Sequence, residues 1–169
     1  MYEANRYSVL IQKIENGLKE IMLSNKAYAY IINEKGDSFF NFDEDGTMIV
    51  YPINSGIVGH VAQTGEIMDI PDPYNHPHFN SLVDIETKLP ILCLPVFSTK
   101  DPKKTIAVMQ TLDLKIAGRG GGKQDLIESE TIRLFQIQIG VCLEQFAKLK
   151  ALQADLQEEK DQVRRGFNS

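Results

Sequence analysis

The 169-residue sequence has little that supports an extracellular, membrane or nucleic-acid role. It contains only two cysteines and no recognisable secretory leader, so we expect a cytoplasmic protein without a disulfide framework. Its apolar runs fall far short of the roughly 20 residues of a membrane-spanning helix, so we expect no membrane partner. Its basic residues are interleaved with acidic ones and its net charge is −5, which argues against nucleic-acid binding.

Sequence signatures of enzymes are also missing. We find no Gly-x-Ser-x-Gly elbow, Walker-type phosphate loop or HExxH helix. The glycine-rich segment 118–123 lacks the spacing of a phosphate loop, so we predict a mobile linker there. His76 and His78 have neither a nearby cysteine nor a His-x-x-x-His spacing, so no metal site is predicted. Cys93 and Cys142 each lie in an apolar run, which is typical of structural cysteine. We therefore predict a protein that is not an enzyme and has no cofactor.

The composition and the first third of the chain indicate an ordinary globular domain. Hydrophobic residues make up 43% and charged residues 24% of the chain, as in soluble domains of this size. Apolar residues recur at three- and four-residue steps over 7–22, which predicts an amphipathic helix. Three short runs then follow at 27–33, 38–42 and 47–51, separated by turn residues. This spacing predicts an antiparallel meander.

The middle of the chain predicts two short helices, a short strand and a strongly apolar hairpin. A helix is expected at 56–63, closed by Thr-Gly, and a strand at 67–70. A modest second helix is expected at about 79–87. The runs 91–97 and 105–113 are almost continuously apolar, which predicts strands covered on both faces of the sheet.

The last segment has the most regular pattern. Apolar residues in steps of three and four predict a helix from about 126 to 163, roughly 57 Å long, which must project from the domain. We therefore divide the chain into a domain at 1–149 and a coiled-coil-like helical extension at 150–169. The extension has too few apolar residues for its own core, which predicts a homodimer. The predicted seam contains Phe146, Leu149, Leu156 and Val163.

Several local strings resemble the GAF domain family. The string Asn-Ser-Gly-Ile-Val-Gly-His-Val-Ala-Gln-Thr-Gly-Glu at 54–66, followed by Ile-Met-Asp-Ile-Pro-Asp at 67–72, looks like the helix and strand of that family. The strings at 87–96 and 106–110 are similar to the next two strands in GAF domains of cyclic-nucleotide phosphodiesterases. The resemblance covers about 7–149.

The resemblance implies an α+β fold, an α/β/α sandwich with a central antiparallel sheet of about six strands. The terminal helices would lie on one face, and the short helices would cover a ligand pocket on the other. It also implies a regulatory module that relays a signal through its terminal helices to other domains. Mapped onto this chain, the implied pocket residues are Gly56, Ile57, Asp69, Asp72, Asn75, Phe79, Thr87 and Gln110.

The sequence departs from the dispersed Asn-Lys-Phe-Asp-Glu motif of GAF domains that bind cyclic nucleotides. Asp113 and Leu114 stand where Asn and Lys are expected, and Ser129 stands in place of Asp. The Lys–Asp pair of the motif therefore cannot form, which predicts weak or absent cyclic-nucleotide binding. Two hypotheses remain open. One is a sensor of a small ligand, for example a nucleotide-like one, and the other is a ligand-free dimerising or scaffolding module. A bilin is disfavoured because no cysteine lies near 69–78.

Overall fold

A computed structural model describes residues 2–114, 125 and 127–167. The predicted linker at 118–123 lies outside the described residues. Helix α1 (Tyr2–Met22) begins earlier than the sequence predicted, and its apolar stripe is buried at Ile11, Leu18 and Met22. The chain then turns at once into the first strand.

The sheet has six antiparallel strands, which confirms the predicted fold class. The strands are β1 (Ser24–Ile32), β2 (Ser38–Phe42), β3 (Met48–Pro52), β4 (Met68–Ile70), β5 (Ile91–Phe97) and β6 (Thr105–Leu114). Their order is β3-β2-β1-β6-β5-β4, so β1 and β6 are central. Strand β5 lies one place from the edge, and β4 lies outside it. The first six residues of β5 are buried, as its continuous hydrophobicity predicted.

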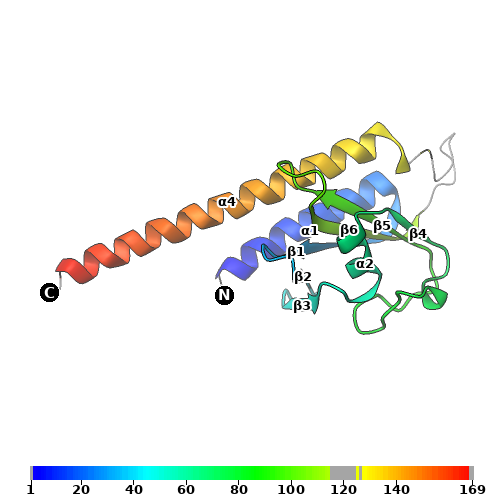
Figure 1. Cartoon of the computed structure of the whole chain (residues 1–169), viewed down its shortest axis with the longest axis horizontal. Coiled ribbons are helices and arrows are strands. Elements are labelled where there is room, and N and C mark those ends of the chain that lie inside the picture. Colours follow the sequence, from blue (N-terminus) through cyan, green and yellow to red (C-terminus); the bar gives the residue numbers. More distant parts are fainter. Residues whose placement is uncertain (1, 115–124, 126, 168–169) are drawn as a thin grey trace.

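Helices cover both faces of the sheet (Figure 1). Helices α1 and α4 (Glu130–Phe167) pack on one face with the side chains of Ala29, Leu94 and Met109. The alternate residues of the same strands, such as Tyr30 and Cys93, face helix α2 on the other side. The terminal helices therefore lie on one face and α2 on the other, as the sequence predicted.

The covering segment on the α2 face differs in part from the prediction. Helix α2 (Gly56–Thr64) forms as predicted and ends at Gly65, whose φ of 68° only glycine adopts readily. A single 3-10 turn, η1, follows at Pro73–Asn75. The predicted helix at 79–87 is wrong. That segment makes one turn, in which the N–H groups of Val83 and Asp84 donate to the Asn80 carbonyl, and then continues without helical structure.

Helix α4 begins at Glu130 rather than near residue 126. The Ser129 hydroxyl accepts a hydrogen bond from the Ile132 N–H at 3.3 Å, as an N-terminal cap does. The helix is 38 residues long and projects well beyond the domain (Figure 1). Arg6 of α1 donates to the side-chain carbonyl of Gln153 at 3.1 Å, so α1 follows α4 at least that far. In the described ranges, no helix is apolar over a length that would span a bilayer.

Three residues of α4 fasten it to β5 and the loop after it. Gln136 donates to the Pro95 carbonyl at 2.7 Å. A Cβ on Gly140 would lie only 2.8 Å from the Phe97 carbonyl oxygen, so the helix and strand backbones are in close contact there. The Glu144 carboxylate accepts hydrogen bonds from the Ser98 and Thr99 hydroxyls and from the Thr99 N–H.

Strand β3 forms one edge of the sheet. Among the described residues, it pairs with β2 and with no other strand. Met48, Ile49 and Val50 are 39%, 38% and 58% exposed, so this edge presents three consecutive apolar residues to solvent.

Candidate functional site

A buried carboxylate occupies the N-terminus of α2. The Ile57 N–H donates to both oxygens of Asp84, at 3.1 and 3.0 Å, and the Asn80 N–H donates to one of them at 2.9 Å. A Cβ at Gly56 would lie 2.7 Å from a carboxylate oxygen, and Gly56 also has a φ of 70°. Glycine is therefore needed here for both space and conformation. One of the N–H groups that the start of this helix would offer to an anion, that of Ile57, therefore already donates to a side chain of this chain.

Asp84 is only 3% exposed. Burial raises the pKa of its carboxyl above the ordinary value, and the backbone N–H donors at Ile57 and Asn80 oppose that rise. The sequence did not predict this role, because the Ile57 N–H that donates to Asp84 lies 27 residues earlier in the chain. A weak signal was present in the Asn four residues before it, whose side chain accepts from the Leu82 N–H and tightens the turn.

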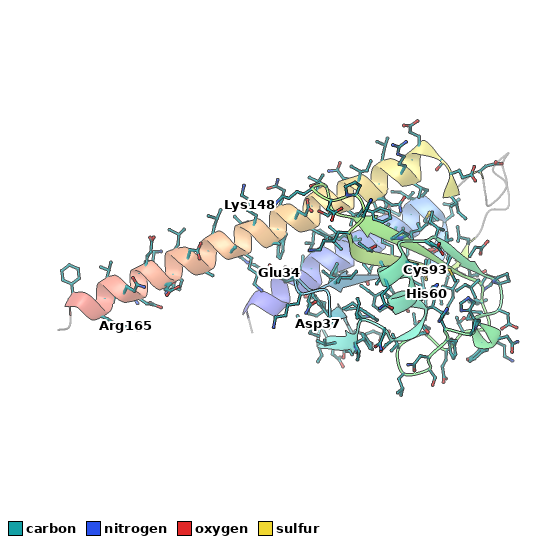
Figure 2. The ribbon with its side chains drawn as sticks, viewed as in Figure 1. Glu34, Asp37, His60, Cys93, Lys148 and Arg165 are labelled. Atoms are coloured by element: carbon teal, nitrogen blue, oxygen red, sulfur yellow. The ribbon has the colours of Figure 1, made fainter. Side chains whose placement is uncertain are left out.

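A hollow of about 530 Å³ opens beside α2. Its lining is mostly polar and consists of Asn54, Gly56, His60, Gln63, Pro77, His78, Phe79, Asn80 and Ser81. Figure 2 labels His60, which lies on α2. The rings of His60 and His78 stack with centroids 3.9 Å apart and an interplanar angle of 15°. The hollow therefore has a flat aromatic wall and amide side chains around it.

The third histidine lies next to this pair. The His76 and His78 ring centroids are 5.6 Å apart, and the His78 N–H donates to Nδ1 of His76 at 3.3 Å. Burial lowers the pKa of His76, and the neighbouring imidazoles lower it further. Among the described residues, no group of three or more His, Cys, Asp or Glu side chains is arranged to hold a metal ion.

The hollow is lined by two of the eight residues that the resemblance implied. Gly56 and Phe79 line the hollow beside α2. Asp72 and Asn75 bond to each other at 2.6 Å on the surface. Thr87 accepts a hydrogen bond from the Leu89 N–H at 2.9 Å.

The other three lie in the sheet or in α2 itself. Asp69 is an exposed residue of β4, paired with Leu92. Ile57 is fully buried against the sheet. Gln110 of β6 is fully buried and donates to the Cys93 sulfur at 3.5 Å, while its carbonyl oxygen has no hydrogen-bond partner among the described atoms.

Core side chains fill the space between α2 and the sheet. Tyr30 and Phe39 are 1% and 0% exposed and contact each other edge to face. Val61 and Val83 close the same cluster from the α2 side. A ligand at Gln110 would therefore have to displace packed apolar side chains.

The two cysteines differ in environment. Cys93 is fully buried, and burial raises the pKa of its thiol to about 12 (Figure 2). It therefore stays protonated near neutral pH, and a neutral buried thiol is a poor nucleophile. Cys142 is exposed on α4, well separated in sequence from the hollow.

The positions of the degenerate motif lie at the end of β6 and the start of α4. Asp113 has a φ of 53°, and its carboxylate accepts a hydrogen bond from the Asn25 side-chain amide. Ser129 caps α4. These residues have local structural roles, and Leu114 cannot supply the cation of the family motif.

The four predicted dimer residues fall into two groups. Leu149, Leu156 and Val163 are 53%, 56% and 57% exposed. Phe146 instead packs inside the chain, with its ring centroid 4.6 Å from that of Tyr7.

Comparison with known proteins gives a consistent result. The family model described as "GAF domain" matches residues 4–143. The alpha subunit of the human rod cGMP-specific 3′,5′-cyclic phosphodiesterase is 27% identical over 67% of this chain, and the bovine subunit is 26% identical. The chain corresponds to only 13% of the length of these relatives.

Solved structures match over most of the chain at low identity. A domain of an Acinetobacter phosphoenolpyruvate-protein phosphotransferase has a TM-score of 0.60 and 14% identity, covering 83% of this chain and 84% of that one. A free methionine-R-sulfoxide reductase from Neisseria meningitidis, solved with its substrate, has a TM-score of 0.56 and 14% identity, covering 82% and 80%. At such identities the match concerns the fold alone, and the fold is compatible with both regulation and catalysis.

Proposed function

This chain belongs to the GAF domain family, and on that premise we propose that it is a dimeric regulatory module that does not use a cyclic nucleotide as its ligand. The family is one of regulatory modules that sense small ligands. The observation that carries the proposal is the Asp84 carboxylate at the N-terminus of α2. A phosphate at that place would meet the carboxylate and would find the Ile57 N–H already bonded to it.

The missing Lys–Asp pair supports the same conclusion. In this family the pair is expected to brace the last strand against the last helix, and Leu114 and Ser129 cannot do so. An energetic bias against the bound arrangement of about 1.4 kcal/mol is enough to weaken binding tenfold.

Titration calorimetry tests the ligand part of the proposal. We expect cyclic AMP and cyclic GMP to give no binding in the micromolar range. A dissociation constant below about a micromolar for either nucleotide would refute the proposal. Separately, native mass spectrometry of the purified protein would show whether a small molecule remains bound and which one it is.

A second candidate is a sensor of a small ligand without a phosphate. The stacked His60 and His78 rings, with Phe79 beside them, offer an aromatic surface next to amide donors and acceptors. In native mass spectra, a peak from a bound small molecule that disappears in His78→Ala but persists in Asp72→Ala would favour this function. Asp72 is the matched control because it lies in the same covering segment but does not line the hollow.

Catalysis by a cysteine thiol is not part of the proposal. Cys93 lies under α2 with its pKa raised to about 12, and Cys142 lies on α4. We therefore assign this chain a regulatory role, although the fold is shared with a reductase.

The signal would pass through β5. This strand carries Cys93 on its α2 face, while the backbone carbonyls of Pro95 and Phe97 contact Gln136 and Gly140 of α4. A shift of the covering segment on the α2 face would move β5, and β5 would in turn move α4. We propose that α4 relays this movement to other domains.

The dimer part of the proposal rests on the exposed apolar residues of α4. Replacing both Leu149 and Leu156 with Glu should give monomers by light scattering, because it puts charges into the seam, while the domain stays folded by circular dichroism. The matched control is Glu158→Gln, a change on the polar side of the same helix. A wild-type protein that is monomeric at tens of micromolar would exclude the dimer.

A further inference from the structure

Strand β3 lies at an open edge of the sheet (Figure 1). Edge strands of soluble domains normally carry charged side chains, a bulge or a covering segment, because an exposed strand can pair with another chain. In β3, Met48, Ile49 and Val50 are uncharged and exposed, and the described register with β2 runs without a bulge. Pro52, the last residue of the strand, is of the kind that limits pairing. An edge left this open requires an explanation.

Hydrogen bonds at the two ends of β3 show which backbone groups point away from the sheet. The Asp43 N–H donates to the Thr47 carbonyl at one end, and the Ile53 N–H donates to the Asp37 carbonyl at the other, both at 3.0 Å. In an antiparallel pair, residues that bond to the partner strand alternate with residues that point their backbone groups away from it. The odd-numbered residues of β3 therefore bond to β2, and the even-numbered residues point outward.

The outward backbone groups belong to Met48, Val50 and Pro52. Met48 and Val50 each offer a donor and an acceptor, whereas Pro52 offers an acceptor only. These groups have the spacing that an added strand needs, because they are two residues apart along β3. The strand is five residues long, so the edge suits a short extended segment.

The side chains of β3 continue both layers of the domain. Val50 lies across from Phe40, which packs on the side of α1. Tyr51 stacks on Phe39 on the side of α2, with ring centroids 5.3 Å apart and an interplanar angle of 27°. A strand added beside β3 would place its own side chains against these two apolar layers. The middle of such a strand should therefore be apolar.

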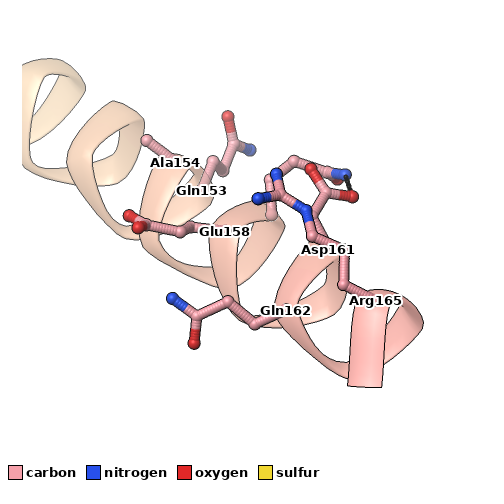
Figure 3. Close-up of a pocket in the computed structure, with 7 residues that line it drawn as sticks. Gln153, Ala154, Glu158, Asp161, Gln162 and Arg165 are labelled. Atoms are coloured by element: carbon pink, nitrogen blue, oxygen red, sulfur yellow. Dashed lines mark hydrogen bonds between the residues drawn. The ribbon is translucent and has the colours of Figure 1, made fainter. Parts of the chain in front are cut away.

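The charges around β3 are unlike those of the rest of the surface. On the projecting part of α4, acidic and basic side chains are mixed, as around Glu158, Asp161 and Arg165 (Figure 3). Segment 33–55, which contains β2, β3 and the turns beside them, has five acidic residues and one lysine, all exposed. They are Glu34, Lys35, Asp37, Asp43, Glu44 and Asp45. This segment therefore accounts for most of the net charge of −5 of the chain.

The unbalanced charge is concentrated in the turn 43–45, at the start of β3. At the other end of the strand, Lys35 acts on the Asp37 carboxyl and partly balances it. In the turn, the Asp43 carboxylate accepts the N–H groups of Asp45 and Thr47 at 3.0 and 2.8 Å and so shapes the turn. The exposed carboxylates of Glu44 and Asp45 are then the ones that a bound segment would meet.

A second copy of this chain suits the edge less well. If two β3 strands paired in parallel, the two acidic turns 43–45 would lie together. If they paired antiparallel, each turn 43–45 would face the turn 34–37 of the other copy, which is also net negative. Like charges at this distance oppose pairing, especially at low salt. The charges thus favour a basic partner.

We infer that β3 is a docking edge for an extended segment of a partner protein, apolar in its middle and carrying lysine or arginine where it meets the turn 43–45. The segment adds a strand to the sheet, with its backbone bonded to Met48 and Val50. Its cations contact Glu44 and Asp45 and fix its position along the edge. This surface is separate from the hollow beside α2 and from α4, so the inference does not depend on the function proposed above.

A pair of synthetic peptides tests the chemistry of the partner. The first has about nine residues, with valine alternating with threonine in the middle and lysine at both ends, and the second has glutamate in place of lysine. By fluorescence anisotropy at low salt, we expect the wild type to bind the lysine peptide at least about tenfold more tightly, and the difference to shrink in about 0.5 M salt. Equal binding of the two peptides, or no binding of the lysine peptide below about a millimolar, would overturn the proposal.

Variants of the chain locate the bound peptide. Val50→Pro removes an outward N–H and leaves the bonds to β2, so it should weaken lysine-peptide binding at least about fivefold while circular dichroism stays unchanged. Val50→Ile keeps the N–H and an apolar side chain, and its binding should stay within about twofold of the wild type. Lysine-peptide binding that is the same in Val50→Pro as in the wild type would place the peptide elsewhere and refute the docking edge.

A double variant tests the charges without touching the strand. Glu44→Gln with Asp45→Asn should remove most of the preference for the lysine peptide, whereas Glu158→Gln on α4 should keep it. An unchanged preference in the double variant would show that the turn 43–45 does not select the partner. If the lysine peptide does not bind, but copies of the chain associate in a way that Val50→Pro abolishes, the occupant of the edge is a second copy and the proposed partner is wrong.

Discussion

The Asp84 carboxylate lies where an N-terminal helix site would otherwise hold a ligand anion. This carboxylate is buried and accepts hydrogen bonds from backbone N–H groups of two segments. Its position leaves room only for glycine at position 56. This one side chain therefore holds the covering segment against the start of α2 and occupies the place that another anion would need.

Asp84→Ala should lower the free energy of unfolding by about 1–3 kcal/mol, because it leaves buried N–H groups of Ile57 and Asn80 without an acceptor. Urea denaturation measures this. Glu86→Ala, an exposed carboxyl nearby, should change stability by less than about 0.5 kcal/mol. An equal effect of the two substitutions would show that the bonds to Ile57 and Asn80 do not stabilise the fold.

The stability contributed by Asp84 should also depend on pH. Its pKa is raised in the folded state, mainly by burial, so folding favours the protonated form. The part of the stability that comes from this raised pKa is fully present below the pKa of the carboxyl in the unfolded chain, and it is lost as the pH rises through the higher pKa of the folded state. Wild type should therefore gain stability relative to Asp84→Asn as the pH falls from neutral towards 4. A difference that is constant over this range would contradict the prediction.

The same residue marks the limit of what the sequence could predict. Periodicity and turn residues identified the strands, α2 and most of α4, because those signals are local. The segment 79–87 was mistaken for a helix because Phe79, Leu82 and Val83 have helical spacing. Asp84 instead bonds to the start of α2, a contact that no local pattern contains. For the same reason, the sequence could not show which of the implied pocket residues would line the hollow.

Among the elements, α4 depends most on close contact with its neighbours. Gly140 brings its backbone against Phe97 of β5, and Gln136 and Glu144 bond to the same strand and loop. The helix is therefore fastened to the sheet at three successive turns. Beyond Gln153 the residues of α4 are almost all exposed.

Gly140→Ala should destabilise the domain by about 1–3 kcal/mol, because the new Cβ would lie 2.8 Å from a backbone oxygen and the helix would have to move. Gly166→Ala is the control, since nothing lies within 4 Å of a Cβ there. That change should be neutral or slightly stabilising in a helix. Chemical denaturation of both variants checks the pair, and equal stability would refute the close contact.

On the scale of the whole molecule, the sheet separates two different surfaces. One face carries α2, the histidines and the polar hollow, and the other carries α1 and α4. Strand β5 contacts both layers. Strand β5 is therefore the element through which the relay proposed above would act.

The bare edge of β3 has a practical consequence for colloidal behaviour. Its unpaired backbone and three exposed apolar residues form a template on which another chain can add a strand. Concentrated samples should therefore contain slowly growing aggregates in addition to any helical dimer, and these would distort light-scattering masses. Val50→Lys places a charge on that edge and should suppress the growth without changing the sedimentation of the dimer. Aggregation that continues unchanged in Val50→Lys would show that the surface responsible for aggregation lies elsewhere.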